Sequence, residues 1–267
     1  MYSYVTLVAN AEYVIGAIAL ARSLQMCHAQ WPLTALVTGD FVGLDDLESA
    51  GCRLLPVASL PLSDDFCHRH SRQQQHERAP FLKGNKPQFH NPLDNFVKLR
   101  AWELESYKKI VFLDADTLVI QNIDRLFQFP EFVAAPNVYE SLADFHRLNS
   151  GVFVAEPSRD TFETLLAALD QPGLFWPRTD QTFLQTFFPD WYGLPYIYNT
   201  LQYVWFNLPQ LWNWDQIRVI HYQYEKPWET DHPKRKQLAP LIDLWQQVYE
   251  RARLPESLPV NDVMASL

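Results

Sequence analysis

The sequence predicts an α/β fold built on a parallel sheet with helices on both faces. Three observations support this class. Strand and helix patterns alternate through the first 57 residues, and the apolar run at 109–113 is typical of a fully buried strand. The composition, with 48% hydrophobic and 20% charged residues, is ordinary for a globular protein. A chain of 267 residues is long enough to bury the core of one large domain or two small ones.

The alternation begins with Tyr4–Ala9, a β-prone run that ends at Asn10. Apolar residues then recur three and four positions apart from Tyr13 to Met26, as in a helix that faces a core. The next expected elements are strands at 33–38 and 52–57 and a helix at 44–50. Ligands bind beyond the carboxyl ends of the strands in such sheets, so Val5–Tyr13 is expected to border a nucleotide site.

The periodic pattern breaks down between Ser63 and Pro92. Four histidines lie in this polar stretch at spacings that match no metal-ligand motif, namely His68, His70, His76 and His90. A mobile loop that can close over a substrate is therefore expected here, rather than a metal site.

The pattern resumes after this stretch. The expected elements are helices at 94–105, 159–169, 179–186 and 238–251, strands at 109–113, 151–155 and 218–221, and an irregular stretch at 194–214. We expect residues 1–230 to form the catalytic domain and residues 231–267 to form a helix and tail that pack on it or trail from it.

Charge and cysteine content narrow the classes of function. The 22 Lys and Arg against 31 Asp and Glu give a net charge of −9, which argues against general attraction to nucleic acid or an anionic membrane. Three cysteines without a CxxC pair indicate a reducing compartment. No uninterrupted apolar run reaches the roughly 18 residues of a membrane span, and no leader pattern is present. We expect a soluble, cytoplasmic protein.

The sharpest feature is the segment 108–127, in which an apolar strand delivers Asp114 and Asp116 to its carboxyl end. Side chains two residues apart on a strand point to the same side, so both carboxylates can approach one ion. Hard cations such as Mg²⁺ and Mn²⁺ prefer oxygen ligands and often bridge to phosphate oxygens. The segment Asp114-Ala115-Asp116 therefore predicts a divalent metal site that holds a diphosphate.

His221 is a second candidate ligand because it follows the short strand at 218–220. A neutral imidazole beside two carboxylates makes a mixed site that suits Mn²⁺ better than Ca²⁺. Lys226, five residues further on, is a cation suited to a phosphate oxygen. By this pattern alone, His221 is as compatible with a structural role as with a ligand role.

The order of these motifs resembles the glycogenin-like glycosyltransferases of family 8. The matching segments, from residue 2 to residue 228, are YVTLVANAEYVIGAIALARSL, FVKLRAW, IVFLDADTLVIQNIDRLF, LNSGVFVAEPS, TDQTFLQTFF, PYIYN and HYQYEKPW. The resemblance implies a single GT-A type domain with a Rossmann-like mixed sheet, a Mn²⁺ or Mg²⁺ ion and a UDP-sugar donor. It further implies hexosyl transfer, of a glucosyl or galactosyl type, with retention at the anomeric carbon; a homodimer is compatible with it.

The same resemblance assigns roles to single positions. The implied metal ligands are Asp114, Asp116 and His221, with Ala115 between the carboxylates and Lys226 on the diphosphate. The implied uridine contacts are Leu7, Ala9, Asn10 and Tyr13. Tyr13 either stacks on uracil or packs at the start of the helix.

The resemblance also implies that four further positions face the transferred sugar, namely Asn149, Ser150, Asp180 and Gln181. Lys98 either reaches the donor or is a solvated helix lysine. Asp180 either faces the sugar or caps a helix. Asp180, Gln181 and Lys98 are the catalytic candidates.

Three stretches depart from the family pattern, one of which is the stretch from Ser63 to Pro92. Gln223–Glu225 form a shorter spacer between the histidine and the lysine than the usual one, which contains glycine. Phe175–Thr179 replace a glycine-rich stretch before Asp180, so the donor sugar stays open.

Three alternatives remain beside transfer to a separate hydroxyl acceptor. They are a self-glucosylating primer of the glycogenin kind, a non-catalytic protein that binds nucleotide sugars, and a nucleotidyltransferase. The last is disfavoured because Val8–Ala11 contains neither the glycine nor the basic residue of its usual loop.

Overall fold

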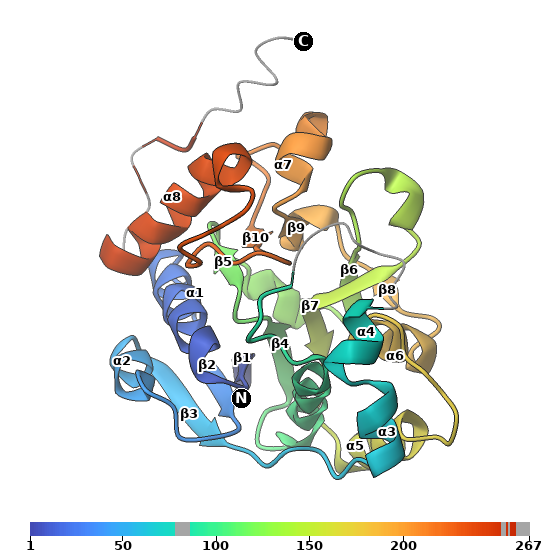
Figure 1. The fold of residues 1–267 in the computed structure, drawn as a ribbon. Helices are drawn as coiled ribbons and strands as arrows, with labels where there is room; N and C mark the ends of the chain where they lie inside the picture. Colours follow the sequence, from blue (N-terminus) through green and yellow to red (C-terminus); the bar gives the residue numbers. More distant parts are fainter. Residues whose placement is uncertain (78–85, 252–254, 256, 260–267) are drawn as a thin grey trace.

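The computed structural model of the chain describes residues 1–77, 86–251, 255 and 257–259. Its centre is a seven-stranded sheet in the order β3-β2-β1-β4-β7-β6-β8 (Figure 1). The strands are β1 (Tyr2–Val8), β2 (Leu33–Val37), β3 (Cys52–Pro56), β4 (Lys109–Leu113), β6 (Val133–Pro136), β7 (Leu148–Ala155) and β8 (Tyr192–Gly193). The first four run parallel, whereas β7 is antiparallel to β4 and to β6. The sheet is therefore mixed, and the predicted α/β class is confirmed.

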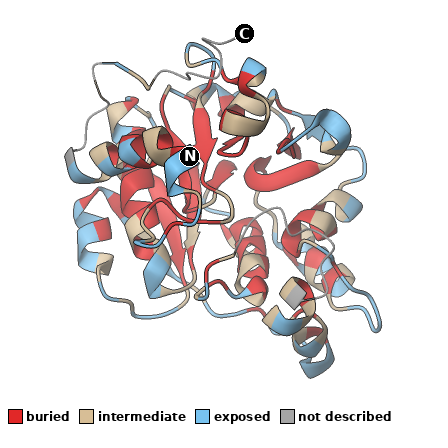
Figure 2. Ribbon diagram, turned by 45° about the horizontal axis from the view of Figure 1, so that its top comes forward, coloured by how far each residue is buried: buried red, intermediate tan, exposed pale blue. Residues whose placement is uncertain are grey.

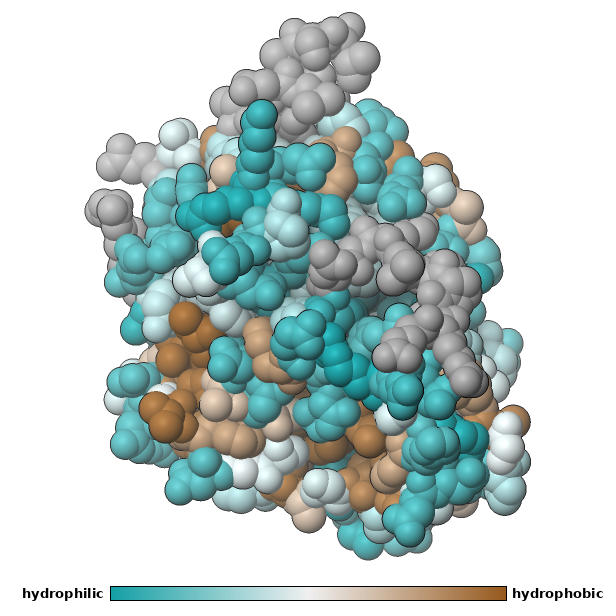
Figure 3. All heavy atoms as spheres, in the orientation of Figure 1, coloured by the Kyte–Doolittle hydropathy of each residue, from teal (hydrophilic) through white to brown (hydrophobic). Residues whose placement is uncertain are grey.

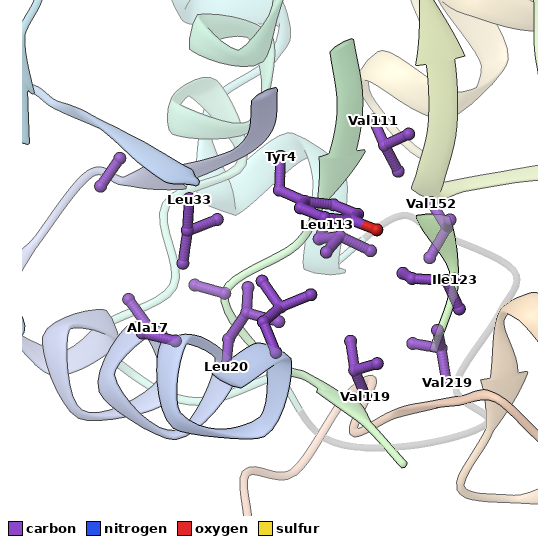
Figure 4. Packing of buried hydrophobic residues seen from close by; sticks show 14 of the residues in the cluster. Tyr4, Ala17, Leu20, Leu33, Val111, Leu113, Val119, Ile123, Val152 and Val219 are labelled. Atoms are coloured by element: carbon purple, nitrogen blue, oxygen red, sulfur yellow. The ribbon is translucent and has the colours of Figure 1, made fainter. Parts of the chain in front are cut away.

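Helices cover both faces of this sheet. One face packs on α1 (Val14–Met26) and α2 (Leu44–Ser49), and the other packs on the 3₁₀ helix η2 (Pro92–Glu103), α5 (Arg159–Leu169) and α6 (Asp180–Phe187). Neighbouring residues of β1 divide between the faces: Tyr4 packs toward α1 with Leu20 and Leu113, as Figure 4 shows, and Val5 packs toward η2. Each fully buried aliphatic side chain contributes roughly 1.5–3 kcal/mol, so these layers fix the sheet.

A second, smaller sheet lies beyond the end of β4. Its strands are β5 (Thr117–Val119), β10 (Val219–His221) and β9 (Thr200–Leu201), in the order β5-β10-β9. The amphipathic helix α8 (Arg235–Arg251) lies beside α1 and buries Leu238, Leu241 and Trp245 in a third hydrophobic cluster (Figure 1). Short helical turns complete the chain, namely η1 (Ala11–Tyr13), η3 (Asp124–Gln128), η4 (Leu142–Asp144), η5 (Tyr196–Tyr198), α7 (Val204–Asn207) and η6 (Pro209–Leu211). The division at residue 230 stays a prediction.

The surface of the molecule differs from its interior in burial and in hydropathy. Buried residues fill the central strands, and exposed residues occupy the outer turns of the helices (Figure 2). Hydrophilic side chains dominate the face in Figure 3, with hydrophobic ones gathered toward its lower part. Among the described residues, no helix is both long and apolar enough to span a bilayer. Cys27 and Cys52 are buried and unbridged, and burial raises the pKa of each thiol to about 12.

Most predicted elements lie within two residues of their observed bounds, but two stretches expected to lack regular structure contain short elements, and one expected helix is a 3₁₀ helix. The stretch 63–92 contains the helices α3 (Asp64–Arg69) and α4 (Arg72–Glu77), and Ser63 caps the first by accepting a 3.1 Å hydrogen bond from Phe66 N–H. These helices are only six residues long, too short for periodicity to reveal. Residues 78–85 of that stretch lie outside the described residues. The expected helix at 94–105 is the 3₁₀ helix η2, and the stretch at 194–214 contains strand β9 and helix α7.

Candidate functional site

A cavity of about 710 Å³ opens at the carboxyl ends of β1 and β4. The chain leaves β1 for β2 on one side, while β4 pairs on the other, so the strand order reverses at this point. Such reversals leave a crevice in open α/β sheets. The predicted site residues that line the cavity are Leu7, Ala9, Tyr13, Lys98, Asp114, Ala115, Asp116, Asn149, Ser150, Asp180, Gln181, His221 and Lys226.

The turn after β4 holds the two predicted carboxylates. Asp114 N–H donates to the Gly151 carbonyl at 2.8 Å, which continues the pairing of β4 with β7 by one residue. The Asp114 carbonyl accepts from both the backbone N–H and the hydroxyl of Thr117, at 3.0 and 2.7 Å. Both ends of the turn are therefore fixed, and Asp116 is brought to the cavity wall with only 6% of its surface exposed.

Strand pairing brings His221 to this turn. In the antiparallel pair of β5 and β10, His221 lies opposite Thr117, and Tyr222 N–H donates to the Asp116 carbonyl at 2.9 Å. The His221 Nε2 atom lies 3.2 Å from Asp116 Oδ1 and 3.9 Å from Asp114 Oδ2. All three ligand atoms lie within 4.8 Å of one another. The structure thus joins residues that are more than 100 positions apart in the chain.

A chain of amide side chains fixes the tautomer of His221. The Asn149 Oδ1 atom accepts from Gly151 N–H at 2.9 Å, and this backbone donor settles the orientation of the Asn149 amide. The same oxygen then accepts from Asn199 Nδ2 at 2.8 Å, which turns Asn199 Oδ1 toward His221 Nδ1 at 2.9 Å. His221 Nδ1 therefore carries the proton, and the lone pair of Nε2 points at the two carboxylates.

These three side chains fit a divalent metal ion. A lone pair that faces two carboxylates is repelled unless a cation lies between them. Octahedral ligands about 2.1 Å from Mg²⁺ lie about 3 to 4 Å apart, which is near the separations of His221 from Asp114 and Asp116. Burial alone would raise the pKa of Asp116, but the ammonium charge of Lys226 holds it well below its ordinary value, so this carboxylate is ionised. Carboxylate oxygens and an imidazole nitrogen are ligands that divalent cations accept in proteins.

Two lysines donate hydrogen bonds to the oxygens of Asp116 and Asp114 that do not face His221. Lys226 Nζ donates to Asp116 Oδ2, and Lys98 Nζ donates to Asp114 Oδ1 at 3.0 Å. Lys98 is only 3% exposed and also pairs with Asp180 Oδ2 at 2.8 Å. Burial lowers the pKa of Lys98, yet the carboxylates of Asp114 and Asp180 raise it above its ordinary value. Lys98 is therefore a buried cation of the cavity, and its alternative as a solvated lysine is wrong.

The Asp180 carboxylate is likewise engaged within the cavity wall. Its Oδ2 accepts from Ser150 Oγ at 2.6 Å as well as from Lys98, and its Oδ1 accepts from Thr179 Oγ1 at 2.8 Å. The residue is the first of α6, but the side chain makes no cap to that helix. Its neighbour Gln181 is also buried and lines the cavity.

Comparison with known proteins bears on the chemistry of this site. The model of the family described as Glycosyl transferase family 8 matches residues 4–232, which is most of the chain. The chain belongs to glycosyltransferase family 8. It is therefore a glycosyltransferase, and its family uses nucleotide-sugar donors.

Curated relatives of this family 8 enzyme include galactinol synthase 4 of Arabidopsis thaliana, at 27% identity over 99% of this chain and 89% of that protein. Glycogenin-2 of Homo sapiens is 31% identical over 99% of this chain and 54% of its own length. The putative UDP-glucuronate:xylan alpha-glucuronosyltransferase 5 of Arabidopsis thaliana is 33% identical over 85% of this chain. The match covers only 36% of that protein's length.

Solved structures confirm the predicted GT-A type fold. The galactosyltransferase LgtC, in complex with donor and acceptor sugar analogs, superposes with a TM-score of 0.61 at 15% identity, over 100% of both chains. The glycosyltransferase GlyE of Streptococcus pneumoniae TIGR4 has a TM-score of 0.64 at 15% identity, covering 99% of this chain and 63% of its own. At such low identity, these likenesses concern the fold alone.

Only some of the residues predicted to contact uridine line the cavity of the glycosyltransferase. Tyr13 lies there with its hydroxyl 3.1 Å from His90 Nδ1 and its ring against the edges of Phe89 and Trp228. Asn10 does not line the cavity; its side chain caps η1 and donates to the Phe89 carbonyl at 3.3 Å. The uridine roles of these residues stay predictions.

Each residue of the short spacer at 223–225 makes a side-chain contact with another part of the chain. Gln223 Oε1 accepts from Asn149 Nδ2 at 3.2 Å, and the buried Glu225 accepts from Lys234 Nζ at 3.0 Å. Tyr224 has a φ of +73°, in the region that favours glycine, and its ring stacks on Tyr203. The spacer thus places a tyrosine side chain in the cavity wall.

The segment 175–179 packs on α3 and α4. His70 Nδ1 lies 3.1 Å from the Phe66 carbonyl, and its Nε2 accepts from Trp176 N–H at 2.9 Å. Burial lowers the pKa of His70 to about 4, so the ring is neutral. Phe175 stacks on this imidazole and lines the cavity. The segment 175–179 and the helices α3 and α4 therefore pack together as one wall of the cavity.

Sequence reasoning missed three contributors to the metal site. Asn199 and Asn149 orient His221, but the motif alone does not reveal that Asn199 is buried beside it. Gly151 is required because a Cβ atom there would lie 2.3 Å from His221 Cε1. The only sequence signal for these residues is their place inside the segments LNSGVFVAEPS and PYIYN.

Proposed function

We propose that this glycosyltransferase is a metal-dependent hexosyltransferase that moves a glucosyl or galactosyl-type unit from a UDP-sugar to a separate hydroxyl acceptor. Transfer proceeds with retention at the anomeric carbon. The observation that carries the proposal is the convergence of Asp114 Oδ2, Asp116 Oδ1 and His221 Nε2 on one point of the cavity. Mn²⁺ suits this mixed set of oxygen and nitrogen ligands, and Mg²⁺ is the second candidate. A UDP-sugar donor is supported by a relative that is named for UDP-glucuronate.

The proposed chemistry centres on the diphosphate leaving group. When bound, the metal ion supplies positive charge that stabilises the diphosphate as the glycosidic bond breaks. Lys226, whose ammonium already lies at Asp116, donates to a phosphate oxygen on the same side. Tyr13 stacks on the uracil, with Leu7, Ala9 and Asn10 around the nucleoside.

The remaining cavity residues orient the sugar. Gln181 offers an amide group to its hydroxyls, while Asn149 and Ser150 lie beside it in the cavity wall with their polar atoms engaged by Gly151, Asn199 and Asp180. Asp180 accepts hydrogen bonds from Lys98, Ser150 and Thr179, so three of the roughly four acceptor sites of its carboxylate are engaged. This arrangement favours attack of the acceptor on the same face as the leaving diphosphate over a covalent intermediate on Asp180. In this mechanism Asp180 and Lys98 act by positioning one another and the donor.

The test is incubation of the enzyme with Mn²⁺ and a panel of UDP-sugars, with UDP release measured. The expected result is metal-dependent turnover of UDP-glucose or UDP-galactose, and NMR of the product should show the anomeric configuration of the donor. Absence of UDP release with every donor, in enzyme that binds Mn²⁺, would refute the proposal. Hexose units on the enzyme itself, detected by mass spectrometry, would instead identify a self-glucosylating primer.

A further inference from the structure

The cavity contains a lysine that the family motifs do not include. Lys86 lines the cavity, and its ammonium lies 5.1 Å from the ring centroid of Tyr224. Among the side chains that the structure describes, no carboxylate lies within ion-pair distance of it. A cation directed into a cavity without an acidic partner is costly unless a ligand supplies the negative charge.

The backbone around Lys86 is anchored. Arg72 of α4 donates through Nη2 to the Lys86 carbonyl at 3.3 Å. Its Nη1 donates to the carbonyls of Pro87 and His90, at 2.8 and 2.5 Å. These bonds use backbone acceptors, so they persist when the side chain of Lys86 is replaced. The backbone that carries Lys86 is therefore fixed against α4.

The charges at the metal site, counted with a bound metal ion and diphosphate, are balanced only if a further cation is present. Three carboxylates, Asp114, Asp116 and Asp180, are paired with two ammonium groups, those of Lys98 and Lys226. A divalent cation and a diphosphate with two negative charges add equal and opposite charge. One negative charge then stays unbalanced, and a third ammonium at the cavity wall neutralises it.

Lys86 also interacts electrostatically with the lysine assigned to the diphosphate. Burial and then the charge of Lys226 lower the pKa of Lys86 to about 8, while Asp116 opposes this shift. The charged and titratable groups around Lys86 are Lys226, Asp114, Asp116 and Asp180 across the cavity, and Arg72, His76, His90 and Tyr224 beside it. Two ammonium groups that repel each other in one cavity favour a shared anion between them.

We propose that Lys86 is a second diphosphate-binding lysine, which contacts the diphosphate of the donor together with Lys226. The inference rests on the proposed function, since it deepens the assignment of the donor site. Because the ammonium binds the anion and the neutral amine does not, a bound diphosphate raises the pKa of Lys86. Affinity for UDP should therefore fall as the pH rises through about 8.

The test is calorimetric titration of the Mn²⁺-loaded enzyme with UDP at pH 7.0 and pH 8.5. Between these values the wild-type Kd should rise about fourfold, as a group with a pKa near 8 loses its proton. K86M should raise the Kd at pH 7.0 at least about tenfold, because a charged hydrogen bond is lost. Its remaining affinity should change less with pH than that of the wild type. K108M is the matched control, because Lys108 is exposed and precedes the opposite end of β4.

K86R separates charge from structure, since arginine stays protonated at both pH values. It should bind UDP more tightly than K86M and lack the pH dependence of the wild type. Equal UDP affinity of K86M and wild-type enzyme, or a fourfold pH effect that persists in K86R, would overturn the inference. If wild-type enzyme loaded with Mn²⁺ binds no UDP at all, the proposed function itself fails, which is a distinct result.

Discussion

Replacing Gly151 by alanine should displace His221 from the metal site. The new Cβ would lie 2.3 Å from His221 Cε1 and 2.5 Å from Nδ1, whereas ordinary contact begins near 3.4 Å. The imidazole must therefore move by about 1 Å, although it is 2% exposed and held by Asn199. Metal sites tolerate ligand displacements of only about 0.2 Å, so His221 should cease to bind the ion.

The expected loss is at least about 10- to 100-fold in metal affinity, the effect typical of disturbing a ligand's support. Overpacking should also destabilise the fold by about 1–3 kcal/mol. Mn²⁺ affinity would be measured by calorimetry and stability by urea unfolding, with G193A as the control. A Cβ at Gly193 meets its nearest atom, in Trp191, at 3.9 Å, so this variant should bind Mn²⁺ normally. A folded G151A protein with wild-type Mn²⁺ affinity would refute the reasoning.

Three further predictions concern the same site and its wall. D114A and D116A should each abolish metal-dependent release of UDP from a UDP-sugar, because each removes an oxygen ligand. N199A should lower Mn²⁺ affinity about 10- to 100-fold, as measured by calorimetry, because His221 Nδ1 loses its acceptor. Lowering the pH from 7 to 5 should reduce the free energy of unfolding through His70. Its folded pKa of about 4 lies below the unfolded value, so the unfolded chain binds the proton first and about 2 kcal/mol is lost. Urea unfolding of H70Q at both pH values should show that this part of the loss is missing.

Each of these predictions has an outcome that contradicts it. Full turnover in D114A or D116A would remove the metal assignment. Unchanged Mn²⁺ affinity in N199A would mean that the amide chain does not orient His221. An equal loss of stability between pH 7 and pH 5 in H70Q and wild type would assign the pH dependence to other groups.

Local elements were predictable because their signals lie within a few residues. The buried strand β4, with four consecutive apolar residues after Lys109, and the helix α5 were predicted at their observed bounds. Periodicity failed where elements are short, as in α3 and α4, and where Pro92 opens a 3₁₀ helix with three residues per turn. Turn residues and apolar spacing carry no information about such irregular segments.

By itself, the sequence determined that Asp114 and Asp116 follow a buried strand and face one side, since a period of two is a local property. The family resemblance added His221, Lys98 and Asp180 to the candidate site. Only the tertiary structure decided that β10 pairs with β5 and so brings His221 to Asp116, and that Asn199 sets the tautomer of that histidine. It also directed Lys86 into the same cavity, from a stretch expected to be a loop. These contacts join distant parts of the chain through packing and hydrogen bonds, and no local pattern in the sequence encodes them.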